Sequence, residues 1–157
     1  MSETEQQGLY VESTVIMTTV RLVTPFILTF GLFIMFHGAD SPGGGFQGGV
    51  VVGSVVMMLA FAYGIDATRE WVDGRLVAAL ASVGVLTFAG IGLGSIVLGG
   101  GFLEYAMYEP LGIKKASKYG IELVELGIGA IVASVIVGLF FVIADGFGHA
   151  IDGGDES

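Results

Sequence analysis

The 157-residue chain contains no cysteine, which excludes disulfide bonds, thiolate metal sites and cysteine nucleophiles. Its two histidines, His37 and His149, are too few for a metal site built from several imidazoles, so we predict no bound metal. Six residues are Lys or Arg against fifteen Asp or Glu, and the net charge of -9 argues against nucleic acid as a partner. Because no nucleophile–base arrangement or cofactor fingerprint is present, we expect neither an enzyme nor a bound cofactor.

Charged residues are also scarce. They make up 13% of the chain, whereas soluble domains contain about 25%, and hydrophobic residues reach 54%. The charges are grouped, which leaves four apolar tracts at about 14–37, 46–65, 76–98 and 120–144. Each tract has the length of about 20 residues that a helix needs to cross a bilayer. We therefore predict an all-α membrane protein with four transmembrane helices in a single membrane domain, 1–157.

Polar segments flank these tracts. Residues 1–13 form a polar head and residues 145–157 an acidic tail, and polar links are predicted at 66–75 and 99–119. With four spans, both termini lie on the same side of the membrane. Lys and Arg are equally frequent on the two predicted sides, so the positive-inside rule leaves the orientation open.

A polar, glycine-rich stretch, 37–49, separates the first two tracts. Pro42 restricts the residue before it to an extended backbone, and the glycines after it allow a tight reversal. We predict a hairpin between the first and second helices at membrane depth, with Phe46 beginning the second helix on an apolar surface. The predicted structural and assembly residues of this hairpin are Ser41, Pro42, Gly43, Gly44, Gly45, Phe46, Gly48 and Gly49.

Four titratable side chains are candidates for an ion path: His37, Asp40, Glu122 and Glu125. The two members of each pair are three residues apart, so each pair shares a helix face. As functional groups they could line a proton or sodium route. The alternatives are that His37 caps the first helix, that Asp40 accepts hydrogen bonds from the hairpin backbone, and that both glutamates reach interfacial water. Glu125 is the deeper glutamate and the preferred candidate.

Small residues recur at four-residue spacing in three of the four tracts. Such faces let helices approach closely in lipid, where apolar burial provides no drive for association. They indicate tight helix packing, either within the chain or against neighbouring subunits. The residues concerned are Gly49 and Gly53, Gly90 and Gly94, and Ala130, Ser134 and Gly138.

The most specific pattern in the chain is Thr24-Pro25 followed by His37-Gly38-x-x-Ser41-Pro42-Gly43-Gly44-Gly45-Phe46-Gln47-Gly48-Gly49. It resembles the B subunit of multisubunit cation/proton antiporters of the Mrp or Mnh type, which is related to membrane subunits of archaeal membrane-bound hydrogenases. The resemblance covers essentially the whole chain. One departure is Lys118, where these proteins often have an acidic residue, so any ion role of the fourth helix rests on Glu122 and Glu125 alone.

The resemblance implies a non-enzymatic integral membrane subunit that supports the assembly of a Na+(cation)/H+ antiporter and lines part of its ion path. The implied partners are the other subunits and the lipid bilayer, with Na+ and H+ as the transported ions of the complex. The implied location is the plasma membrane of a prokaryote, with several spans and cytoplasmic termini. Two alternatives remain: a membrane subunit of an energy-converting hydrogenase or complex-I-like redox-driven pump, and a homo-oligomeric channel assembled through the glycine faces.

Overall fold

The computed structural model describes residues 13–40 and 42–152, with side chains as far as residue 146. Most of the predicted polar head, 1–12, and the end of the predicted acidic tail, 153–157, lie outside the described residues. Within the described part, every element is a helix.

Six helices make up this part of the chain. Four of them, α2, α3, α5 and α6, are long and apolar enough to cross a membrane, which confirms the prediction of an all-α chain with four such helices. The ends of α2, α3 and α5 lie within two residues of the predicted ends. The elements are α2 (Thr14–Phe36), α3 (Gly45–Tyr63), α4 (Ile65–Trp71), α5 (Gly74–Val97), the 3-10 helix η2 (Tyr105–Leu111) and α6 (Ala116–Asp152).

The two predicted links contain helices of their own. The first part of the link at 66–75 belongs to α4, which begins directly after Gly64. Gly64 is the C-terminal cap of α3, and its φ of +98° favours glycine. Thr68 donates its hydroxyl to the Gly64 carbonyl at 2.9 Å. The link at 99–119 contains η2, where the Tyr108 hydroxyl donates to a carbonyl of α5 at 2.6 Å. Polar composition predicts an exposed link but does not distinguish a short helix from a loop, which explains the difference.

The last helix, α6, is longer than the sequence predicts. Instead of a helix over 120–144 and a separate tail from residue 145, α6 begins at Ala116 and continues to Asp152. No proline lies between these two residues. Once a helix has formed, each further residue adds one backbone hydrogen bond, so α6 extends into the polar segment.

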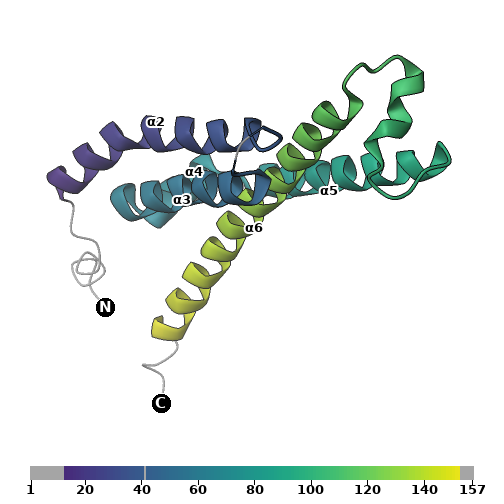
Figure 1. Cartoon of the computed structure of the whole chain (residues 1–157). Coiled ribbons are helices and arrows are strands. Elements are labelled where there is room, and N and C mark those ends of the chain that lie inside the picture. The colour runs from purple at the N-terminus through teal and green to yellow at the C-terminus, as the bar shows by residue number, and fades with distance from the viewer. Residues whose placement is uncertain (1–12, 41, 153–157) are drawn as a thin grey trace.

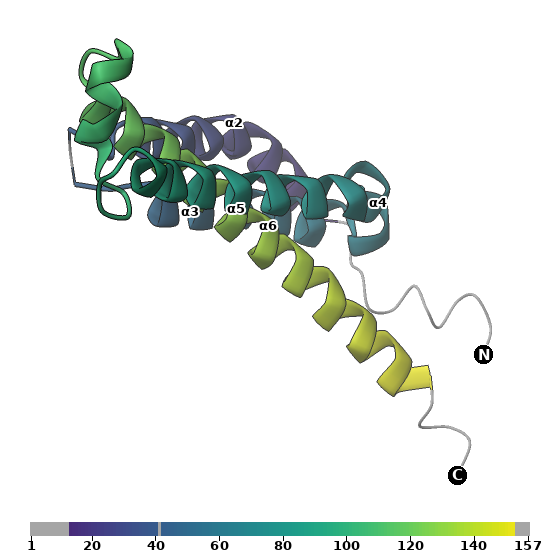
Figure 2. The ribbon, with the colours of Figure 1, turned by 90° about the vertical axis from the view of Figure 1, so that its right-hand side faces the viewer.

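The long helices pack in the order α2, α3, α6 and α5: α3 lies between α2 and α6, and α5 packs against α6. Figures 1 and 2 show that α6 crosses the other long helices obliquely and that its C-terminal end projects away from them. A helix of 37 residues is about 55 Å long, whereas the hydrocarbon core of a bilayer is about 30 Å thick. An oblique course allows so long a helix to cross the membrane.

Glycines allow α6 to approach α3 and α5 closely. A Cβ atom on Gly49 of α3 would lie 2.7 Å from the carbonyl oxygen of Gly129, and one on Gly84 of α5 would lie 2.5 Å from that of Gly127. The Gly49–Gly53 pattern therefore packs within the chain, as small-residue faces do in lipid. The Gly90–Gly94 pattern does not join two long helices, because Gly94 contacts Tyr108 of η2 and nothing lies near Gly90.

Candidate functional site

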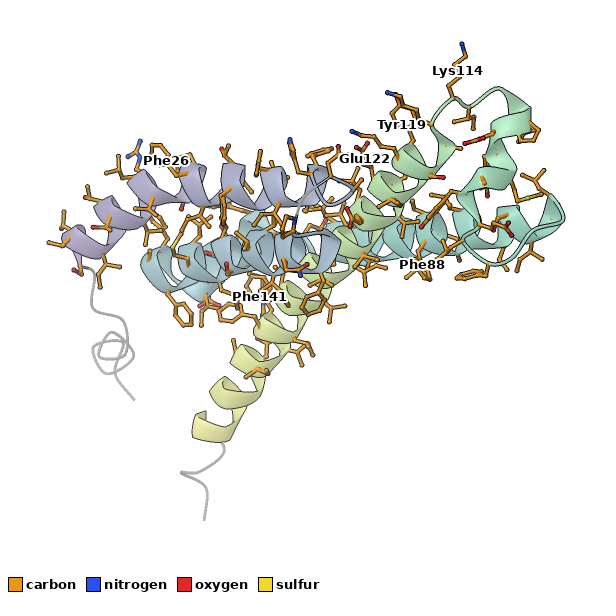
Figure 3. The ribbon with its side chains drawn as sticks, viewed as in Figure 1. Phe26, Phe88, Lys114, Tyr119, Glu122 and Phe141 are labelled. Carbon is orange, nitrogen blue, oxygen red and sulfur yellow. The ribbon has the colours of Figure 1, made fainter. Side chains whose placement is uncertain are left out.

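The predicted ion-path residues come from the α2–α3 connection, residues 37–44, and from the first turns of α6. Helix α2 ends at Phe36 and α3 begins at Gly45, so the last five residues of the predicted hairpin, 45–49, belong to α3. Figure 3 shows Glu122 on the part of α6 that passes the end of α2. The connection and α6 therefore face each other, although about 80 residues separate them in the sequence.

His37 is the C-terminal cap of α2. Its backbone N–H donates to the carbonyl of Ile34, and its Nδ1 lies 3.0 Å from the carbonyl oxygen of Phe33. Because a carbonyl can only accept, Nδ1 is the donor in this contact. The imidazole also stacks on the Phe33 ring with the two centroids 4.1 Å apart. These are the contacts of a residue that closes a helix end.

Asp40 joins the connection to α6 through an ion pair with Lys118. Its Oδ2 accepts a hydrogen bond from the Lys118 ammonium, which holds the pKa of the Asp40 carboxyl below its usual range. Lys118 Nζ also lies 3.9 Å from Glu122 Oε1, one turn further along α6. Asp40 thus pairs with a side chain of α6, in contrast to the sequence alternative in which it binds backbone N–H groups of the connection.

Glu125 lies one turn beyond Glu122, where glycines surround its side chain. A Cβ atom on Gly38 would overlap the Glu125 carboxyl group, and one on Gly44 would lie 2.8 Å from its Oε1. A Cβ atom on Gly45 would overlap the Glu125 backbone carbonyl. Oε2 of Glu125 is buried and has no hydrogen-bond partner among the described residues. We call these three glycines the glycine cradle of Glu125.

The glycines of the signature also have roles besides the cradle. Gly43 has a φ of +148° and Gly44 one of +147°, so their backbones turn in a way that favours glycine. Gly48 and Gly49 lie inside α3, where Gly48 packs against Met35 and Gly49 against α6. The sequence predicts a reversal here, but it does not predict that the same glycines make room for a carboxyl group.

Three further residues of the signature are Ser41, Pro42 and Phe46. Ser41 lies outside the described residues. Pro42 is exposed, and the Phe46 side chain is 61% exposed on the first turn of α3. Phe46 therefore presents an aromatic ring to the surroundings of the chain and contributes little to its core.

Tyr105 of η2 is a neighbour that sequence reasoning missed. Its ring packs against Gly120 in the first turns of α6. Burial raises the pKa of the Tyr105 hydroxyl, and the charge of Glu125 raises it further. The sequence indicates only a tyrosine in a polar link here, because nothing in it shows that η2 folds back onto α6.

Apolar packing closes the region beyond Glu125. Met35 of α2 is buried between Gly48 of α3 and Gly129 of α6. Further along α6 lies a cavity of about 280 Å³ lined by apolar side chains of the four long helices and by Ser134. Within residues 13–40 and 42–146, no group of three His, Asp or Glu side chains is placed to hold a metal ion. The arrangement therefore places one carboxyl group, whose Oε2 is buried, near the end of the bundle where α2 joins α3.

Known proteins with similar sequences place the chain in a family. The family model described as a domain related to the MnhB subunit of Na+/H+ antiporter matches residues 15–138. The chain is 32% identical to the Na(+)/H(+) antiporter B subunit of Bacillus subtilis over 58% of its own length and 63% of that protein. It is 30% identical to a Staphylococcus haemolyticus protein named putative antiporter subunit mnhB2, over 86% of this chain and 97% of the relative. It is 31% identical to the protein named putative antiporter subunit mnhB2 from Staphylococcus aureus strain Newman, over 84% of this chain and 94% of the relative.

Proposed function

Because this chain belongs to the family of MnhB subunits of Na+/H+ antiporters, we propose that it is a non-enzymatic integral membrane subunit of a multisubunit Na+/H+ antiporter. The observation that carries the proposal is the family match over residues 15–138, which takes in three of the four spanning helices almost entirely and most of the fourth. The complex would lie in the plasma membrane of a prokaryote with the termini of this chain in the cytoplasm. It would exchange Na+ against H+ across that membrane.

The exposed apolar surface of the chain supports a place inside a larger assembly. Only Val20, Gly31 and Met35 are buried among the residues of α2, and only Gly84, Gly92 and Ser95 among those of α5. Lipid or neighbouring subunits must cover the rest in a membrane. We infer that the chain supports assembly by offering these faces to the other subunits, and that His37, Asp40, Glu122 and Glu125 line part of the ion route of the complex.

A deletion strain tests the function directly. We expect loss of Na+ tolerance and loss of Na+/H+ antiport in everted membrane vesicles, with both restored by the wild-type gene. Unchanged Na+ tolerance and unchanged antiport in the deletion strain would overturn the proposal.

Co-purification tests the partners. A tagged copy of the chain is expected to bring down other antiporter subunits from solubilised membranes. Recovery of hydrogenase or iron–sulfur subunits would instead identify a redox-driven pump. Ion conductance by the purified chain alone in liposomes would identify a channel.

Two variants of the connection test the role in assembly. Pro42→Gly removes a fixed backbone angle, and Phe46→Ala removes the exposed ring on the first turn of α3. We expect both to lower the amount of the chain that co-purifies with the other subunits and to lower antiport in proportion. Phe46→Leu keeps an apolar side chain and is the matched control. If Pro42→Gly and Phe46→Ala assemble and transport like the wild type, the connection is only a tolerated linker.

A further inference from the structure

Glu125 is the last ionisable residue in the first part of α6. The next one along the helix is Asp145. From Leu126 to Ala144 the sequence contains no Asp, Glu, Lys, Arg, His or Tyr. The group therefore lies at the boundary between the charged start of α6 and a long apolar stretch, 126–144. An ionisable group placed at such a boundary in a membrane protein is costly and indicates a function.

The surroundings of Glu125 favour a neutral carboxyl group. Its Oε2 is buried with no hydrogen-bond partner among the described residues, and the glycine cradle encloses the carboxyl on the side of the connection. Glycine contributes neither a charge nor a side-chain hydrogen bond that would stabilise a carboxylate. A negative charge left without such compensation in an apolar environment is unfavourable, whereas the protonated acid is neutral.

A line of charged groups connects Glu125 to the exposed Asp40–Lys118 ion pair. Lys118, Glu122 and Glu125 follow one another at helical spacing, so they lie along one face of α6. Exposure of the side chains falls along this line, from 58% for Asp40 through 43% for Lys118 to 25% for Glu122. It ends at the buried Oε2 of Glu125. The groups thus form a graded route that begins at the Asp40–Lys118 ion pair.

No comparable route continues on the other side of Glu125 within the described residues. Met35 and the apolar cavity of about 280 Å³ follow it along α6. The part of α3 that borders the cradle contributes Gln47, which does not titrate. The titratable groups facing this region are His37 and Asp40 from the connection, Lys115 just before α6, Lys118 and Glu122 from α6, and Tyr105 from η2.

We propose that Glu125 is a proton-binding site, loaded and unloaded from the end of the bundle where α2 joins α3, through the line of Asp40, Lys118 and Glu122. Binding converts the carboxylate to the neutral acid, and the proton comes from water at that surface. The glycine cradle leaves room for the carboxyl group, because a side chain on Gly38 or Gly44 would meet it. This inference goes beyond the proposed function, since a proton can bind Glu125 whichever machine contains the subunit.

Carbodiimide labelling of the assembled complex tests the proposal. Dicyclohexylcarbodiimide is an apolar reagent whose central carbon is attacked by the oxygen of a protonated carboxyl group while a nitrogen takes up the proton, and mass spectrometry of proteolytic peptides locates the adduct. We expect the adduct on Glu125, with a yield that falls as the pH rises. No adduct on Glu125 at any pH, or a yield independent of pH, would overturn the proposal. Because the adduct is located on peptides of the wild-type protein, this test remains valid even if a variant fails to assemble.

Variants and added Na+ distinguish a proton site from a cation site. Glu125→Gln should abolish the labelling of this peptide, while the matched variant Glu70→Gln, an exposed glutamate of α4 outside this line, should keep it. Lys118→Gln removes a positive charge from this line, and a nearby positive charge disfavours the protonated acid, so labelling of Glu125 at a given pH should increase. Unchanged labelling would contradict the coupling of this line to Glu125. Labelling should not respond to Na+ at constant pH. Protection by Na+ would assign the carboxyl to cation binding and overturn the proton assignment.

Discussion

The two halves of α6 pack in opposite ways. Its first half contacts backbone atoms of glycines, with Gly45 and Gly49 of α3 and Gly84 of α5 all too close to it to carry a side chain. From Gly129 to Asp145, in its middle and second half, α6 borders two cavities of about 280 and 380 Å³, and Ser134 lines both. Each end also has one ion pair to another element, Lys118–Asp40 at the start and Arg69–Asp145 near the end.

The difference shows where this small chain is rigid. Burial of apolar surface does not drive helices together in lipid, so close backbone contact is the main means of defining their positions. The first half of α6 has such contacts, and there the charged line and the glycine cradle lie. The second half relies on larger side chains, cavities and one exposed ion pair, so substitutions should be tolerated better there.

Substitution in the glycine cradle should have the largest effect. Gly45→Ala places a Cβ atom on the Glu125 backbone carbonyl, which no side-chain rotation can relieve. We expect a loss of about 1–3 kcal/mol, as is typical of overpacked sites, and less assembled complex. The matched control is Gly90→Ala, also in a long helix, where nothing lies within 4 Å and the helix should gain up to about 1 kcal/mol. Thermal unfolding of the purified complex measures the stability of both variants. Equal stability would show that Gly45 is no more tightly packed than Gly90.

Loss of the ion pair at the far end should matter less. Arg69 donates to Asp145 Oδ1 at 2.6 Å and to the Phe141 carbonyl at 3.0 Å, and both charged side chains are more than a third exposed. We expect Arg69→Gln to lower stability by about 1 kcal/mol or less. A double-mutant cycle with Asp145→Asn isolates the contribution of the pair. A loss as large as that of Gly45→Ala would mean that the second half of α6 is held as firmly as the first.

Removing the hydroxyl of Ser134 should not destabilise the chain. Its Oγ is buried and has no hydrogen-bond partner among the described residues. Because an unsatisfied polar group destabilises the folded state, Ser134→Ala should leave stability unchanged or raise it by up to about 1 kcal/mol. Thermal unfolding of the complex is again the measurement. A clear loss would show that another subunit or a water molecule binds this hydroxyl in the assembled complex.

The smallest expected effect is the pH dependence of the Asp40–Lys118 pair. Since Lys118 lowers the pKa of Asp40 in the folded chain, the stabilisation is present above 3.8, the value of an unpaired Asp, and is lost as the pH falls through the folded-state pKa. The wild type should therefore lose its small advantage over Asp40→Asn in acid. Unfolding midpoints of the two proteins across acidic pH values measure this. If the two unfolding midpoints differed by the same amount at every pH, the Asp40–Lys118 pair would not be the cause of the difference in stability.

The spanning helices were predictable because their signal is local. Tract length and the scarcity of charge identified all four, and three of them have ends within two residues of the prediction. The sequence did not predict the length of α6, because its polar C-terminal residues resemble a tail and only helix continuation places them in α6. It also missed α4 and η2, whose polar sequences resemble loops.

The candidate site was predictable only in part. Spacing along α6 identified Glu122 and Glu125 as a pair and Glu125 as the deeper one, since such spacing is a property of a single helix. The bond between Asp40 and Lys118 joins residues far apart in the chain, and the position of Tyr105 depends on how η2 folds back. No local pattern contains that information.

The sequence by itself determined that the chain is helical, that it has four spans, and which family it resembles, because apolar length and the glycine signature are properties of the chain alone. Only the tertiary structure decided what the glycines of that signature do. These glycines have no side chain at the points where the connection and α3 meet α6. The carboxyl group of Glu125 lies in the space that side chains would otherwise fill. The physical reason is that the effect of an absent Cβ depends on which atoms approach it, and here those atoms come from a helix about 80 residues further along the chain.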